Sequence, residues 1–231
     1  MKTIGIIGGI GPETTLEYYK RIIAAHRELT NDGSYPSIVI TSIDAKRLIG
    51  PIMAGKHDEV VELLLAEIAR LHRAGASFAA IAANTPHIVF DDLKAQSSLP
   101  LVSIVEATAD AALERGIKKP VLLGTRPTME ASFYPEVFAR KGMRIMTPDA
   151  MDREYIHEKY MGELFHNVIT AETRDRLASI IAALRDRDGI DGIILGGTEL
   201  SLILTEPSYA GVPVLDTTQI HVQRIVDESL A

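Results

Sequence analysis

The chain of 231 residues contains no cysteine. This absence excludes disulfides, thiolate metal sites, iron–sulfur clusters and every catalytic mechanism that uses a thiol. Any chemistry must therefore come from carboxylates, imidazoles, hydroxyls, amines or backbone groups.

Basic residues are in the minority, because 24 Lys and Arg stand against 31 Asp and Glu, giving a formal charge of −7. A nucleic-acid partner is not expected, since neutralising phosphates requires a basic face. No apolar run approaches the ~20 residues that span a bilayer, so no membrane association is expected either. Residues 1–13 indicate a first strand and turn rather than a signal peptide, and we expect a cytoplasmic protein.

Short apolar runs alternate with longer stretches of helical period along the chain. The expected strands are residues 4–7, 37–41, 78–82, 101–104, 121–123, 144–146, 190–195 and 212–215. Helices are expected over residues 12–29, 58–74 and 153–165, among others. In the first of these helices, Leu16, Tyr19, Ile22 and Ile23 are expected to share the buried side. Near-continuous apolar strands separated by helices predict an α/β fold with parallel sheets flanked by helices.

A weak internal repeat suggests two copies of one α/β unit. Gly8 precedes Ala83 by 75 positions, and Gly124 precedes Gly197 by 73, in two similar pairs of strand ends. We therefore expect two pseudo-symmetric lobes, one of residues 1–100 plus a C-terminal helix of about 216–231, the other of residues 101–215. A ligand cleft between them, beyond the carboxyl ends of the strands, is the expected site. The alternative is that any doubly wound protein shows such pairs of apolar strand and glycine.

The glycine-rich turn at residues 8–12 does not fit a dinucleotide-binding loop. Gly9 and Gly11 supply G-x-G, but Thr14 stands where the last glycine belongs, and no acidic residue follows the second strand at the usual distance. The backbone N–H groups around Gly9 could instead bind a small carboxylate at the helix start. The alternative is a tight turn without a ligand.

Polar residues follow two of the expected strands at matching positions. Asn84 and Thr85 follow one strand, and Thr198 and Glu199 follow the other. They could present two mirrored sets of polar groups to one small acid, or they could simply cap the next helices.

Among the seven histidines, only His87 is expected near the cleft, and the alternative for it is a histidine bonded to backbone. No H-E-x-x-H pattern occurs, and no metal site is expected. Arg47 and Lys159 could each pair with a substrate carboxylate, although a surface cation is the simpler explanation for either. Lys159 lies on the expected helix 153–165, where Tyr155, Ile156, Tyr160 and Leu164 suggest a half-buried face.

Five stretches together resemble the aspartate/glutamate racemase superfamily, in particular its amino-acid racemase branch. They are residues 1–12, 82–87, 123–130, 196–200 and 215–218. The resemblance runs nearly end to end. It implies two pseudo-symmetric lobes with the site between them, no cofactor and a homodimer.

Racemases of this family use two cysteines, one on each face of the substrate α-carbon. The resemblance places them at Ala83 and Gly197, so racemisation by two thiols is not expected here. The small replacements are expected to enlarge the pocket slightly. With the family positions included, the predicted substrate-binding residues are Gly9, Arg47, Asn84, Thr85, Thr125, Lys159, Gly197, Thr198 and Glu199.

The sequence therefore predicts a protein that resembles a cofactor-independent amino-acid racemase and binds a small amino acid or dicarboxylate. Its proton chemistry would use Glu199 and His87, with Thr85 in support, because a threonine hydroxyl alone is a poor base at neutral pH. Two alternatives stay open. The protein could be an inert carboxylate-binding protein on the racemase scaffold, or a carboxylate lyase or decarboxylase that works without thiols.

Overall fold

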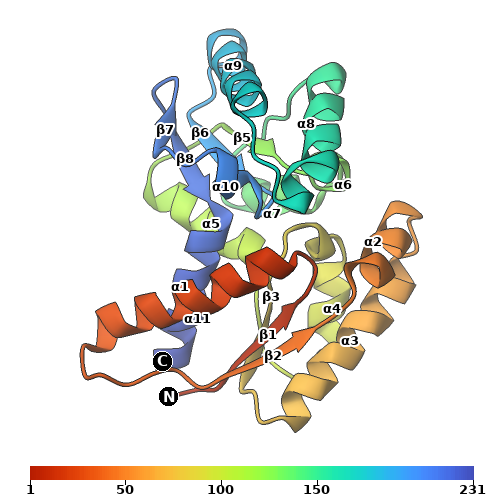
Figure 1. Ribbon diagram of the computed structural model, residues 1–231, viewed down its shortest axis with the longest axis vertical. Helices are drawn as coiled ribbons and strands as arrows, with labels where there is room; N and C mark the ends of the chain where they lie inside the picture. The colour runs from red at the N-terminus through yellow and green to blue at the C-terminus, as the bar shows by residue number, and fades with distance from the viewer. The chain divides into compact units, whose positions relative to one another are not determined.

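The computed structural model describes residues 1–231 and divides the chain into two compact units (Figure 1). The first unit comprises Met1–Ala107 and Thr218–Ala231, and the second comprises Thr108–Thr217. None of the helices combines the length and the apolar character that crossing a bilayer demands.

The first unit is built on a four-stranded parallel sheet of order β2-β1-β3-β4. Its strands are β1 (Ile4–Gly8), β2 (Ile38–Ser42), β3 (Phe78–Ile81) and β4 (Leu101–Val102). Every residue of β1 and β3 is buried, as expected for central strands covered on both faces.

Helices cover both faces of this sheet. On one face, α1 (Pro12–Thr30) and α11 (Thr217–Leu230) pack against it, with Tyr18 and Val226 in the shared core. On the other face, α2 (Ala45–Met53), α3 (His57–Arg73) and α4 (Phe90–Gln96) enclose a second core. The short helix η1 (Thr85–Val89) follows β3, and α5 (Ile104–Glu114) contains the boundary between the units.

The second unit has strand order β5-β6-β8-β7, in which β7 alone is antiparallel. Its strands are β5 (Pro120–Leu123), β6 (Gly192–Leu195), β7 (Ser208–Tyr209) and β8 (Val212–Asp216). Met146 adds a parallel bridge to Val121 of β5. With that bridge, the order Met146-β5-β6-β8 repeats the order β2-β1-β3-β4 of the first unit, which confirms the predicted fold of two related α/β lobes.

Six helical segments belong to the second unit. They are α6 (Arg126–Glu130), α7 (Phe133–Arg140), α8 (Ala150–Gly162), η2 (Leu164–His166), α9 (Ala171–Asp188) and α10 (Leu200–Ile203). Tyr160 of α8 and Leu177 of α9 lie in one apolar core with Val121 and Ile193 of the sheet.

Several expected elements have different bounds in the structure. The expected strand 144–146 is reduced to the single bridge at Met146, because β5 and Met146 exchange only a short stretch of backbone bonds. The expected strand 101–104 ends at Val102, since Ile104 already begins α5. Helix α8 begins at Ala150, three residues before the expected start, because Asp149 caps it by accepting the N–H of Asp152 at 3.0 Å.

The buried face of α1 was predicted correctly at Ile22 and wrongly at Leu16 and Tyr19. Leu16 and Tyr19 are exposed, whereas Thr14, Tyr18, Ile22 and His26 are buried. These four residues follow one another at spacings of four and so form one row along the helix. Thr14 and His26 of this row are polar, which is why a pattern based on apolar side chains found only Ile22 of it.

Candidate functional site

The glycine-rich turn between β1 and α1 is tightly packed. Gly9 has φ of +83°, and a Cβ there would lie 2.3 Å from the carbonyl oxygen of Ile43, so only glycine fits. The backbone N–H of Gly9 donates to Oγ1 of Thr15 at 2.9 Å. The amide proposed as a carboxylate ligand is therefore bonded within the turn, which favours the alternative of a tight turn without a ligand at this amide.

The carboxyl end of β3 presents the first set of predicted polar residues. Ala83 and Asn84 are buried, and Thr85 is half-buried at the start of η1. The carbonyl of Asn84 accepts the N–H of His87 at 3.0 Å. Because Ala83 contributes only a methyl group, the polar side chains that directly follow β3 are the amide of Asn84 and the hydroxyl of Thr85.

His87 is held inside the first unit by both ring nitrogens. Its Nδ1 donates to the carbonyl of Ala83 at 3.0 Å, and its Nε2 accepts the N–H of Ile104 at 3.3 Å, so the ring is one neutral tautomer. The ring also stacks on Phe90. Burial, together with His221, lowers the pKa of His87 to about 3. This geometry favours the backbone-bonded alternative over a role as a base.

The two cations predicted to bind a distal carboxylate lie on helices. Arg47 is exposed within α2. Lys159 lies on α8 and pairs with Glu163, and the hydrogen bond to Glu163 raises the pKa of Lys159. Glu163 also accepts the hydroxyl of Thr173 at 2.5 Å. A substrate carboxylate would have to displace Glu163 in order to use this lysine.

Thr125 begins α6 as its N-cap. Its Oγ1 accepts the N–H of Thr128 at 3.4 Å and lies 3.0 Å from Oγ1 of Thr128. This is the bonding that Ser and Thr supply at helix starts. Capping is therefore the role that the observed contacts give to Thr125.

A buried carboxylate stands at the carboxyl end of β6. Glu199 is 5% exposed, and its Oε2 accepts the hydroxyl of Thr198 at 2.8 Å and the phenol hydroxyl of Tyr160. Tyr160 comes from α8 and is equally buried, at 5% exposed. Two donors on one carboxylate oxygen fix the orientation of Glu199 within the second unit.

Tyr160 acts as the proton donor in this pair. Burial raises the pKa of Tyr160 well above its ordinary value, and the negative charge of Glu199 raises it further. The phenol therefore keeps its proton at neutral pH and donates it to the bond with Glu199.

The ring of Tyr160 fills the side-chain space of position 197. A Cβ built on Gly197 would lie 2.3 Å from Cε2 of Tyr160 and 2.9 Å from its hydroxyl oxygen. Both distances are shorter than real Cβ contacts. The expected enlargement of the pocket at Gly197 is therefore wrong, since an aromatic ring from another element takes up the space.

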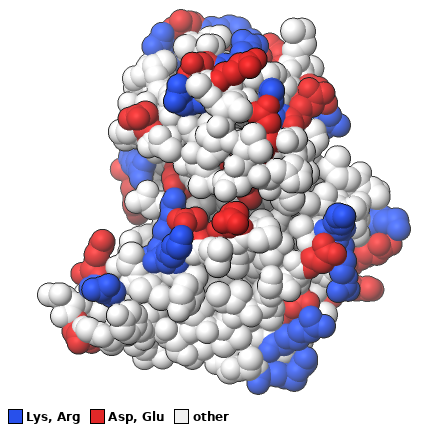
Figure 2. Space-filling view, in the orientation of Figure 1, with Lys and Arg blue, Asp and Glu red and all other residues white.

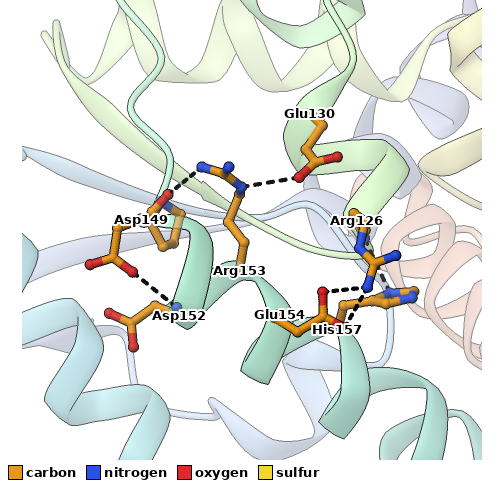
Figure 3. A network of polar contacts seen from close by, with 8 residues as sticks. Arg126, Glu130, Asp149, Asp152, Arg153, Glu154 and His157 are labelled. Atoms are coloured by element: carbon orange, nitrogen blue, oxygen red, sulfur yellow. Dashed lines mark hydrogen bonds and ion pairs between the residues drawn. The ribbon is translucent and has the colours of Figure 1, made fainter.

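A polar network ties α8 to α6 on the surface of the second unit (Figure 3). Arg126 pairs with Glu154, and its backbone N–H donates to Nδ1 of His157 at 3.2 Å. Arg153 reaches from α8 to Glu130 at 3.3 Å. These contacts hold the helix that carries Tyr160 against α6, which follows β5.

Sequence reasoning missed the role of Tyr160, which it assigned to the half-buried packing face of its helix. The contact with Glu199 joins residues 39 positions apart on different elements. No local sequence motif indicates this contact. The one available signal was Gly197 itself, because a missing side chain in a close-packed interior requires a neighbour to fill its volume.

Charged residues elsewhere do not form a further centre. Lys and Arg lie beside Asp and Glu in small mixed groups on the face shown in Figure 2, without a broad basic region. No group of three or more His, Asp and Glu side chains is placed to hold a metal ion.

Taken with these sites, the two units of equivalent strand order define an α/β protein of the racemase type. The family model described as Asp/Glu/hydantoin racemase matches residues 7–225. The chain therefore belongs to the Asp/Glu/hydantoin racemase family.

Individual relatives agree along the full length. The chain is 26% identical to the broad specificity amino-acid racemase RacX of Bacillus subtilis (strain 168), covering 99% of this chain and 98% of that protein. Among solved structures, it is similar to a candidate Asp/Glu racemase from Yersinia pestis, with 35% identity, a TM-score of 0.91 and complete coverage of both chains. An aspartate racemase homologue from Pyrococcus horikoshii OT3 gives 36% identity and a TM-score of 0.86, also with complete coverage of both.

Proposed function

We propose that this protein is an enzyme of the amino-acid racemase type that transfers a proton at the α-carbon of a small amino acid or dicarboxylate. Glu199 is the acid–base group, and no cofactor takes part. The proposal is carried by the buried carboxylate of Glu199, held by Tyr160 and Thr198 at the end of β6. It stands beside Gly197, where the family resemblance places a cysteine.

The observed contacts support proton transfer on one face of the substrate better than inversion. Inversion needs one group to remove the α-proton and a second to return it from the opposite side. In the first unit, Ala83 has no ionisable group and His87 uses both nitrogens internally. We therefore expect hydrogen exchange with retained configuration to be faster than racemisation.

The remaining polar groups are proposed as ligands of the substrate. Asn84 and Thr85 at the end of β3, and Thr198 at the end of β6, are suited to bind the carboxylate or ammonium group. Arg47 is the exposed cation available for a distal carboxylate.

The test is deuterium incorporation at the α-carbon in D2O, for aspartate, glutamate and a broad panel of amino acids. Mass spectrometry measures exchange, and chiral chromatography measures inversion in the same samples. Glu199→Gln should lower the exchange rate about 100-fold, the contribution typical of a positioned acid–base group. Glu206→Gln, at an exposed carboxylate of the same unit, is the matched control and should exchange at the wild-type rate.

Two outcomes would contradict this proposal. Equal exchange by the wild type and Glu199→Gln would remove Glu199 from the reaction. No exchange with any compound, together with thermal stabilisation by some of them, would identify an inert carboxylate-binding protein instead.

A decarboxylase is the second candidate, and the one-sided acid–base arrangement favours it. Loss of CO2 from a substituted malonate leaves a carbanion that needs a single proton, which a group on one face supplies. Product analysis with substituted malonates separates this activity from exchange on amino acids.

A further inference from the structure

We infer that Tyr160 couples position 197 to Glu199: its ring confines position 197 to glycine, and its hydroxyl positions the Glu199 carboxylate. The second role deepens the proposed function and rests on it. The first role is a matter of packing and stands independently.

The packing argument starts from the space around Gly197. A Cβ there would lie 2.3 Å from Cε2, 2.8 Å from Cζ and 2.9 Å from the hydroxyl oxygen of Tyr160. The clash falls on the outer edge of the ring, so a side chain at position 197 would require the whole ring to move. The ring belongs to the apolar core of the second unit, where close packing leaves little room for such movement.

The movement would also break the hydrogen bond that orients the carboxylate. The hydroxyl of Tyr160 donates to the same oxygen of Glu199 that accepts Thr198. If the ring is pushed aside, a buried carboxylate loses one of these two donors, which is costly in an apolar interior. A side chain at position 197 and an ordered Glu199 therefore exclude each other.

This exclusion predicts what happens when a thiol is placed at position 197. Reintroducing a cysteine at Gly197 does not restore a proton carrier beside Glu199. The cysteine side chain would displace the ring of Tyr160 and so break its hydrogen bond with Glu199, because both side chains need the same volume.

The packing role is tested by melting temperatures, which need no activity. Gly197→Ala should lower the melting temperature by roughly 5–10 °C, the effect of an overpacked core in a chain of this size. Gly162→Ala, at a helical glycine with open space, should leave it nearly unchanged. In a Tyr160→Leu background, which lacks the outer ring atoms, Gly197→Ala should cost far less than in the wild type.

The outcomes of this cycle are decisive even if Gly197→Ala alone does not fold. Recovery of folding in the Tyr160→Leu/Gly197→Ala variant supports the packing role. An equal loss in both backgrounds, or a double variant that unfolds where Tyr160→Leu alone folds, overturns it.

The positioning role is tested with Tyr160→Phe, which keeps the ring and removes the hydroxyl. On the substrate identified by deuterium exchange, kcat should fall at least about tenfold while KM stays nearly constant, the pattern of a group that acts on the chemical step. Tyr155→Phe, on the same helix, should leave both constants unchanged. An unchanged kcat in Tyr160→Phe would overturn the positioning role. Absence of exchange in the wild type would instead refute the proposed function. The packing role of Tyr160 would still be decided by the melting temperatures.

Discussion

Tyr18, His87 and His221 form a buried polar group in the first unit. The hydroxyl of Tyr18 donates to Nδ1 of His221 at 2.8 Å, and Nε2 of His221 donates to the carbonyl of Val102 at 3.1 Å. The rings of His87 and His221 meet edge to face with centroids 6.4 Å apart. Burial lowers the pKa of His221 to about 4, and that of His87 is lowered to about 3. Both histidines are therefore neutral in the folded protein at pH 7.

These depressed pKa values predict a loss of stability in mild acid. An unfolded histidine titrates near pH 6.5, so below that pH the unfolded chain binds protons that the folded chain does not bind. The stabilisation is fully present above about pH 6.5 and is lost as the pH falls toward 4. Each histidine should contribute about 1.4 kcal/mol per pH unit in this window.

Urea unfolding at pH 7 and pH 5 measures this effect. His87→Gln should reduce the pH dependence of the free energy of unfolding by the contribution of one histidine, about 1.4 kcal/mol per pH unit. His72→Gln, at an exposed histidine, should leave the dependence as in the wild type. Identical pH dependence in all three proteins would contradict the assignment of His87 as a buried neutral group.

Single side chains cap the starts of α6, α8 and α9 in the second unit. Oγ1 of Thr170 accepts the N–H of Thr173 at 3.2 Å and caps α9, whose buried residues pack on the sheet. Thr170→Ala should reduce the free energy of unfolding by about 1 kcal/mol, because one backbone donor loses its partner. Ser179→Ala, at an exposed hydroxyl on the same helix, should change it by less than about 0.5 kcal/mol. Equal effects of the two changes in chemical denaturation would show that capping does not govern the stability of α9.

The elements differ in how far the sequence could predict them. Central strands such as β1 and β3 were confirmed because both faces are buried, which leaves an apolar run that is visible without the fold. The pairing of Met146 at the edge of the second sheet and the choice of buried residues on α1 depend on the elements that pack against them, which the local sequence does not show. His26 and Thr14 are buried there by tertiary packing, which overrides their polarity.

The candidate site shows the same limit. Glu199 and Thr198 could be selected from their place after an apolar strand. For Gly9 and His87, the sequence could offer internal bonding only as an alternative, because the bonding partners depend on the fold. The pair of Lys159 and Glu163 has the i,i+4 spacing of a helical ion pair, a signal that the sequence contains.

At the scale of the whole molecule, α1 and the edge strand β2 of the first unit both carry exposed apolar side chains. Leu16 is 54% and Tyr19 46% exposed on α1, and Ile40 is 38% exposed on β2, an edge strand of the sheet. We propose that a second copy of this chain covers this face, in agreement with the homodimer that the family resemblance implies. An open sheet edge beside apolar side chains is a surface that proteins usually cover.

Light scattering coupled to gel filtration tests this association. The wild type should have the mass of a dimer, and Leu16→Lys/Tyr19→Lys should have the mass of a monomer, because the charges would be buried without partners. Met151→Lys, at the most exposed large apolar side chain, should remain a dimer. A monomeric wild type would show that the chain does not dimerise. A dimeric double variant would show that the dimer contact lies on another surface.

The Tyr160–Glu199 pair has a consequence for the conditions that the protein tolerates. Its two polar groups are a phenol and a carboxylate, and peroxide does not convert either of them to an acid of higher oxidation state, as it does a thiolate. Alkylating reagents and soft metal ions that react with thiolates have no cysteine to modify in this chain. The proton transfer proposed for Glu199 would use oxygen atoms, so peroxide would find no thiolate there to oxidise.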